Sequence, residues 1–128
     1  MQVRNLMQQP VVSVGPGQSV RQAARLMQDH VIGSVVVQEG DRLAGILTER
    51  DVLRAVAEGR DLERTPVAEL MTKSLVTAGP NWDVVVAASV MTANRIRHLV
   101  VQEQDRLLGV LSLRDVLSVF LPDQVHEQ

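Results

Sequence analysis

Two segments of the chain share a pattern that could bind an anion: a glycine, two apolar residues, a hydroxyl and, three residues later, an acid. If a strand ends at the apolar pair, Thr48 and Ser112 stand at helix N-caps, and Asp51 and Asp115 stand at position N3. Backbone amides and the helix dipole favour a phosphate there, and the hydroxyl can donate to it. The carboxylate repels phosphate but can accept hydrogen bonds from a ribose diol. The pattern therefore predicts a site for a nucleoside phosphate.

The same residues also have a simpler interpretation. A hydroxyl at the N-cap and an acid three residues later form a helix-capping pair that needs no ligand. One copy taken alone favours the cap, and a duplicated cap is still a cap. The spacing leaves both interpretations open.

The two segments belong to an internal repeat with an offset of 64 residues. Residues 3–56 align on residues 67–120 without a gap and are identical at about 24 of the 54 positions. A repeat of about 60 residues would bury only about 60% of its surface if it folded alone, so we expect the repeats to share one core. We expect a first repeat at 1–59, a linker at 60–66, a second repeat at 67–121 and a C-terminal tail at 122–128.

Each repeat has the signals of a β-α-β-β-α unit, which predicts an α+β fold. A short strand at 11–14 is followed by a turn at 15–17 and by a helix capped by Ser19. Residues 32–38 and 43–47 are apolar runs separated by turn residues, which indicates an antiparallel hairpin. In the helix after the hairpin, we expect Val52, Leu53, Val56 and Ala57 on the buried side. The second repeat follows the same order.

Composition argues against several classes of protein. The formal net charge is −2 and there is no basic stripe, which argues against binding to a nucleic-acid backbone. The aromatic residues are Trp82 and Phe120 alone, which are too few to stack single-stranded bases. There are no cysteines, and the histidines lack the spacing of a zinc site. No apolar run could span a bilayer and no signal-peptide pattern is present, so we expect a cytoplasmic protein. The sequence offers no catalytic constellation, so we expect no enzymatic activity.

The ordered, duplicated motifs resemble a known family. They are residues 67–72, residues 94–101 and the two segments 45–51 and 109–115. Together they resemble a tandem pair of cystathionine-beta-synthase (CBS) domains, also called a Bateman module. The resemblance implies two repeats related by pseudo-twofold symmetry. It also implies two clefts that bind adenosine-containing ligands such as AMP, ADP, ATP or S-adenosylmethionine.

The resemblance also implies roles for individual residues. Asp51 and Asp115 would hold the ribose, and Thr48 and Ser112 would contact phosphate. The adenine would lie against aliphatic and small residues, which are Val12, Ser13, Val14 and Ile32 in one site and Val76, Thr77, Ala78 and Ile96 in the other.

The second repeat alone carries basic residues before its apolar strand. These are Arg95, Arg97 and His98, where the first repeat has Val31, Gly33 and Ser34. In the family, basic residues at this place reach the phosphates of charged adenylates, and a planar guanidinium suits that contact. A solvated strand end is the alternative. We expect two sites with unequal preference for phosphate.

These expectations lead to a non-enzymatic regulatory sensor that binds adenine nucleotides and needs no obligatory cofactor. Whether magnesium accompanies the phosphates stays open. One alternative is a structural module whose clefts stay empty. Family members commonly form homodimers through their helices, and the apolar residues for such an interface would be Val52, Leu53, Val56, Val116, Leu117 and Phe120. Another alternative is a regulatory subunit for a separate enzyme or transporter.

Overall fold

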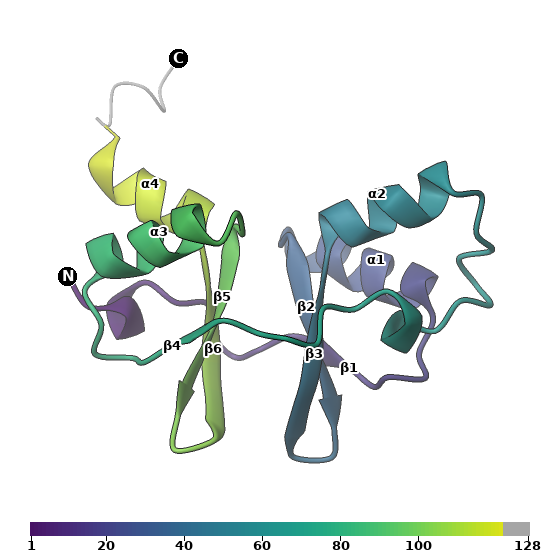
Figure 1. Cartoon of the computed structure of the whole chain (residues 1–128), viewed down its shortest axis with the longest axis horizontal. Coiled ribbons are helices and arrows are strands. Elements are labelled where there is room, and N and C mark those ends of the chain that lie inside the picture. Colours follow the sequence, from purple (N-terminus) through teal and green to yellow (C-terminus); the bar gives the residue numbers. More distant parts are fainter. Residues whose placement is uncertain (122–128) are drawn as a thin grey trace. The chain divides into compact units, whose positions relative to one another are not determined.

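A computed structural model describes residues 1–121 and divides the chain into two compact units. Residues 11–75 form one unit, which we call the first-repeat unit. Residues 1–10 and 76–121 form the other, the second-repeat unit. Each contains a three-stranded sheet and two α-helices, which confirms the expected α+β class (Figure 1). The expected tail at 122–128 lies outside the described residues.

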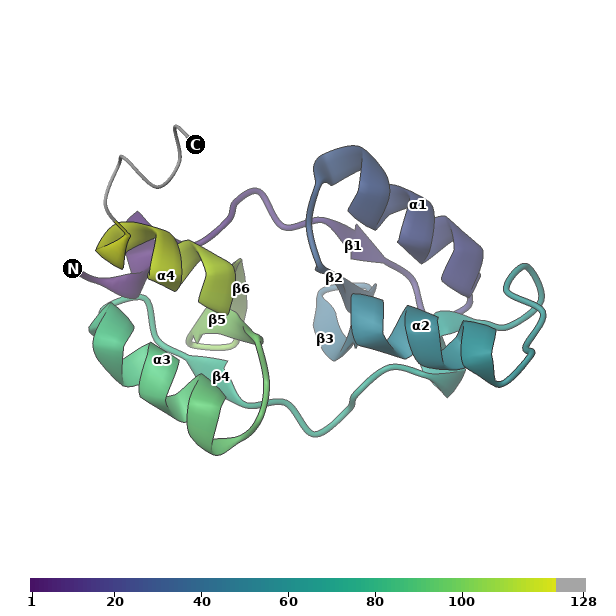
Figure 2. The same ribbon diagram turned by 90° about the horizontal axis from the view of Figure 1, so that it is seen from above.

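The first-repeat unit follows the predicted order of elements. They are β1 (Ser13–Val14), α1 (Val20–His30), β2 (Ser34–Glu39), β3 (Arg42–Thr48), α2 (Glu49–Ala57) and the 3-10 turn η2 (Val67–Glu69). The β-branched run at 35–37 makes β2 the central strand, parallel to β1 and antiparallel to β3. The helices α1 and α2 pack beside each other against the sheet (Figure 2).

The second-repeat unit has the same topology. Its elements are η1 (Val3–Asn5), β4 (Thr77–Ala78), α3 (Val84–Ala93), β5 (His98–Glu103), β6 (Arg106–Ser112) and α4 (Leu113–Phe120). The central strand is β5, parallel to β4 and antiparallel to β6. In both hairpins the register shifts after the fourth residue of the central strand, Val37 or Val101.

The compact units do not coincide with the sequence repeats, because the short segments that open the repeats are exchanged. Residues 1–10, at the start of the first repeat, pack in the second-repeat unit, and η2 packs in the first-repeat unit. Gln8 and Val110 exchange two backbone hydrogen bonds of 2.8 and 3.2 Å. A Cβ at Gly109 would lie 2.8 Å from the carbonyl oxygen of Gln8, so only glycine lets the segment approach β6 this closely. Gly45 has the same role beneath Thr72.

Each unit has its own hydrophobic core, so the expectation of one shared core is wrong. Leu47 with Val35 and Val37 centres one core, and Leu111 with Leu99 and Met91 centres the other. The exchanged segments explain how such small units bury enough surface. Val67 completes the first core, Val3 completes the second, and both side chains are fully buried.

The expected buried face of α2 is also partly wrong. Leu53 and Val56 are more than half exposed, whereas Asp51 and Ala55 are buried. The cap determines which face of α2 is buried. The carboxylate of Asp51, at position N3, bonds back to the backbone N–H of Thr48 at the end of β3, and this places Leu53 and Val56 on the outer face of the helix. Within residues 1–121, no helix is long and apolar enough to cross a membrane.

Candidate functional site

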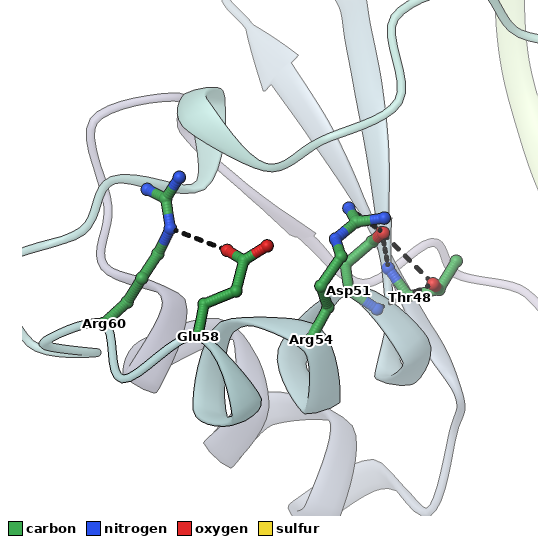
Figure 3. Close-up of polar contacts among 5 residues, drawn as sticks. All are labelled: Thr48, Asp51, Arg54, Glu58 and Arg60. Atoms are coloured by element: carbon green, nitrogen blue, oxygen red, sulfur yellow. Dashed lines mark hydrogen bonds and ion pairs between the residues drawn. The ribbon is translucent and has the colours of Figure 1, made fainter.

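In the first-repeat unit, Thr48 and Asp51 form a reciprocal capping box at the start of α2 (Figure 3). The backbone N–H of Asp51 donates to Oγ1 of Thr48 at 3.4 Å. Oδ2 of Asp51 accepts from the backbone N–H of Thr48 at 2.9 Å and from its hydroxyl at 3.1 Å. The capping interpretation of this pair is therefore realised in full.

The second oxygen of Asp51 is also occupied. Nη2 of Arg54, one turn along α2, donates to Oδ1 at 3.0 Å (Figure 3). Asp51 is only 6% exposed. This carboxylate is thus satisfied at both oxygens, with its charge compensated by a guanidinium.

The corresponding pair in the second-repeat unit has different partners. Oγ of Ser112 accepts from the backbone N–H of Asp115 at 3.0 Å, which caps α4. Oδ2 of Asp115 accepts from Nε2 of Gln8 at 3.0 Å. Position 118, equivalent to Arg54, is a serine whose hydroxyl donates to the backbone carbonyl of Asp115. Among residues 1–121, Asp115 has no ion pair, and its Oδ1 has no hydrogen-bond partner.

The residue just before each central strand also supports the start of the capped helix. The first N–H of α4, on Leu113, donates to the carbonyl of Arg97 at 2.8 Å. In the first-repeat unit the equivalent bond joins Glu49 to Gly33 at 3.0 Å. Arg97 therefore lies at the amino end of α4, exposed, and without an ion pair within the described part of the chain.

The structure places the other two basic residues separately. His98 is the first residue of β5 and pairs in register with Ser112. Arg95 is exposed in the connection between α3 and β5, with a left-handed φ of 57°. The strand-to-helix junction thus brings together Ser112, Asp115, Arg97 and His98. Arg95 lies two residues before Arg97, nearer the end of α3.

The residues expected to contact adenine lie on β1 and β4 and beside them. Each of these strands is separated from the strand that leads into the cap by the central strand, so about 10 Å of sheet lies between them. Val12, Val76 and Thr77 are partly buried, Ser13 is exposed, and Ile32 and Ile96 pack at the edges of their cores. Val14 and Ala78 are core residues with 3% exposure.

Gln8 and Arg54 were not among the residues predicted from the sequence. Both are visible in the repeat as broken equivalences, since Gln8 aligns with Thr72 and Arg54 with Ser118. Only the structure shows that both differences act on the same pair of aspartates. Within residues 1–121, no group of three His, Asp or Glu side chains is placed to hold a metal ion.

Comparison with known proteins gives consistent matches over nearly the whole chain. The family model of the CBS domain matches twice, at residues 3–58 and 67–122. The CBS domain-containing protein YhcV of Bacillus subtilis is 39% identical over 115 residues, which are 89% of this chain and 81% of that protein.

Solved structures agree with the sequence match. A CBS-domain containing protein from Agrobacterium tumefaciens is 37% identical with a TM-score of 0.87, covering 94% of this chain and 93% of that one. A CBS domain protein from Pyrobaculum aerophilum, solved in complex with AMP, is 33% identical with a TM-score of 0.82. That match covers 90% of this chain and 89% of the other.

Proposed function

The chain belongs to the CBS domain family, and we propose that it is a regulatory module that binds adenosine-containing ligands, with AMP, ADP and ATP as the preferred class. The AMP complex of the relative from Pyrobaculum aerophilum supports the adenosine part of this proposal. Binding would favour one conformation of the chain, or of a regulated enzyme or transporter, over another.

One observation supports the proposal: three suitable residues meet at the amino end of α4. They are Ser112 with its capping hydroxyl, Asp115, whose Oδ1 has no hydrogen-bond partner among residues 1–121, and Arg97, whose backbone carbonyl accepts from the first N–H of the helix. The ribose diol would bind the carboxylate, and the phosphate would bind the guanidinium and the helix end. The adenine would lie toward Val76, Thr77 and Ile96.

We propose that the second-repeat unit binds charged adenylates more tightly than the first-repeat unit. The first residue of α2 is Glu49, whose carboxylate repels phosphate, whereas the first residue of α4 is Leu113. Gly33 replaces Arg97 beside the α2 terminus and supplies no positive charge.

Calorimetric titration with AMP, ADP, ATP and adenosine tests this function. Asp115→Ala should weaken AMP binding by about tenfold or more, because it removes a charged hydrogen-bond acceptor. Asp51→Ala is the matched variant in the other unit and should have a smaller effect. The proposal fails if no adenosine compound binds, or if both variants keep wild-type affinity.

Substitution of Arg97 tests the phosphate contact separately. Arg97→Gln should reduce the affinity for AMP and ATP by about fivefold to tenfold while leaving the affinity for adenosine nearly unchanged. Arg25→Gln is the control, since Arg25 is an exposed arginine on α1, in the first-repeat unit. Equal losses for AMP and adenosine would contradict a phosphate contact.

A second candidate function, self-association, is favoured by the surface of α3 and α4. The helices α3 and α4 lie side by side (Figure 2). The helix α3 has no charged residue and exposes Val85 and Val86, and α4 exposes Leu117 and Phe120. A helix that is apolar on all sides is normally buried. A twofold interface pairs the same patch on both subunits, and exposed valine, leucine and phenylalanine side chains do not repel their own copies, so we propose that this surface pairs with its copy in a homodimer.

The repeat supplies a matched test of this interface. The residue of α1 equivalent to Val85 is Arg21, which a folded unit accepts at this position. Val85→Arg should raise the dimer dissociation constant at least tenfold in sedimentation experiments. Glu103→Arg, an exposed residue at the end of β5, is the control and should leave it unchanged. A wild-type monomer at all concentrations, or a dimer that Val85→Arg leaves intact, would refute the proposal.

A further inference from the structure

The two aspartates of the repeated motif differ in the group that holds each carboxylate. Asp51 is held by Arg54, and Asp115 is held by Gln8. The equivalents of these partners make no such contact: Ser118 bonds to a backbone carbonyl, and Thr72 lies at the position of Gln8 without bonding to Asp51. The repeats therefore differ at two pairs of equivalent positions, 8 with 72 and 54 with 118, and these differences give each aspartate a different partner.

Arg54 makes Asp51 a poor acceptor for a further ligand. Its guanidinium donates a charge-assisted bond to Oδ1, and the cap occupies Oδ2. A ribose diol could bind this carboxylate only by displacing the arginine or opening the cap. Because Asp51 is 6% exposed, the displaced state would also leave a poorly hydrated charge.

Gln8 leaves Asp115 competent to bind. A neutral amide donates one hydrogen bond to Oδ2 without cancelling the charge, and Oδ1 has no hydrogen-bond partner among residues 1–121. The amide is itself well positioned, because the Gln8 backbone is fixed to Val110 by two hydrogen bonds and passes directly over Gly109. The carboxylate is thus oriented by a segment from the start of the chain.

We infer that these partners determine which repeat takes the ribose: Arg54 blocks Asp51, and Gln8 is a positioning residue that presents Asp115. This inference rests on the proposed function, since it assigns the selectivity of the same site. It assigns the difference in ribose binding between the two units to the residues at four positions, which are 8, 54, 72 and 118.

Exchanging the partners tests the inference. Gln8→Thr with Ser118→Arg gives the second-repeat unit the residues of the first, and it should weaken both AMP and adenosine at least tenfold. The loss for adenosine distinguishes a ribose effect from a phosphate effect. Gln8→Glu is a second variant that keeps the length of the side chain but replaces the donor with a like charge, and it should weaken both ligands as well.

The reciprocal exchange should create binding. In an Asp115→Ala background, Arg54→Ser with Thr72→Gln should raise adenosine affinity at least fivefold through Asp51, and further Asp51→Ala should remove the gain. Arg25→Ser is the matched control and should produce none. Thermal melting without ligand checks that every variant is folded.

The outcomes separate the inference from the proposed function. If the wild-type protein binds AMP but neither exchange changes the affinity for adenosine, the inference is overturned and the proposed function stands. If the wild-type protein binds no adenosine compound, both fail. Loss of binding in the first exchange together with gain in the second supports the inference.

Discussion

The first-repeat and second-repeat units share their backbone structure and differ in some of the side chains that surround it. Both have a three-stranded sheet with the same order and register, the same register shift in the hairpin, a glycine beneath an exchanged segment and a hydroxyl cap. They differ at the aspartate partners, in the charge beside the capped helix and in the exposed surface of the first helix. Duplication has thus kept what the fold requires, and the differences indicate what each copy does.

The largest effects should come from the two cores. Leu47→Ala and Leu111→Ala each remove a fully buried side chain, and each should destabilise the protein by about 3 kcal/mol. Because the cores are separate, hydrogen exchange should accelerate mainly in the unit that carries the change. Equal acceleration in both units would show that they unfold as one cooperative body.

A smaller effect is expected at the two glycines of the repeated motif. Gly109→Ala places a Cβ 2.8 Å from the Gln8 carbonyl oxygen, and Gly45→Ala places one 2.7 Å from that of Thr72. Each should cost about 2 kcal/mol, as overpacking typically does. Gly109→Ala should expose residues 1–10 to proteolysis, and Gly45→Ala should not. Resistance of residues 1–10 in both variants would contradict the close approach.

The cap with more hydrogen bonds should contribute more to the free energy of unfolding. Thr48→Ala removes a hydroxyl that accepts from and donates to Asp51, whereas Ser112→Ala removes only an acceptor. We expect losses in unfolding free energy of about 1.5 and about 1 kcal/mol, measured by urea denaturation. A larger loss for Ser112→Ala would show that the capping box adds nothing to the first-repeat unit.

The smallest effects concern two residues with left-handed backbone after the first helix of each unit. Val31 has φ 53° and Arg95 has φ 57°. Glycine relieves the Cβ contact in this conformation, so Val31→Gly should stabilise the protein by up to about 1 kcal/mol. The β-branched valine is the more strained, so Arg95→Gly should gain less. Thermal melting of the two variants measures the difference, and destabilisation by Val31→Gly would refute the assignment.

Much of the fold could be predicted from the sequence because local signals and the repeat agree. The caps at Ser19, Thr48 and Ser112 and both hairpins lie where their residues indicated. The exchange of the opening segments could not be predicted, because both repeats open with similar residues that give no indication of which unit each segment joins. The phase of α2 was missed because Asp51 takes a buried position that apolar periodicity assigns to Leu53 or Val56.

The candidate site was only partly accessible from sequence. The motif located Ser112 and Asp115, and the broken symmetry pointed to Arg97, which the structure places at the same helix end. The partners Gln8 and Arg54 could not be assigned, because Gln8 is 107 residues from Asp115 and Arg54 has the appearance of an ordinary surface arginine. Side-chain contacts, rather than the pattern, distinguish an occupied aspartate from an available one.

The most direct test of the central claim is to follow the backbone amides of the two capped helices by NMR while AMP is added. The account predicts that the amides of residues 113–115 at the start of α4 shift at lower AMP concentrations than those of residues 49–51 at the start of α2. Shifts confined to residues 49–51, or no shift at either helix, would contradict it.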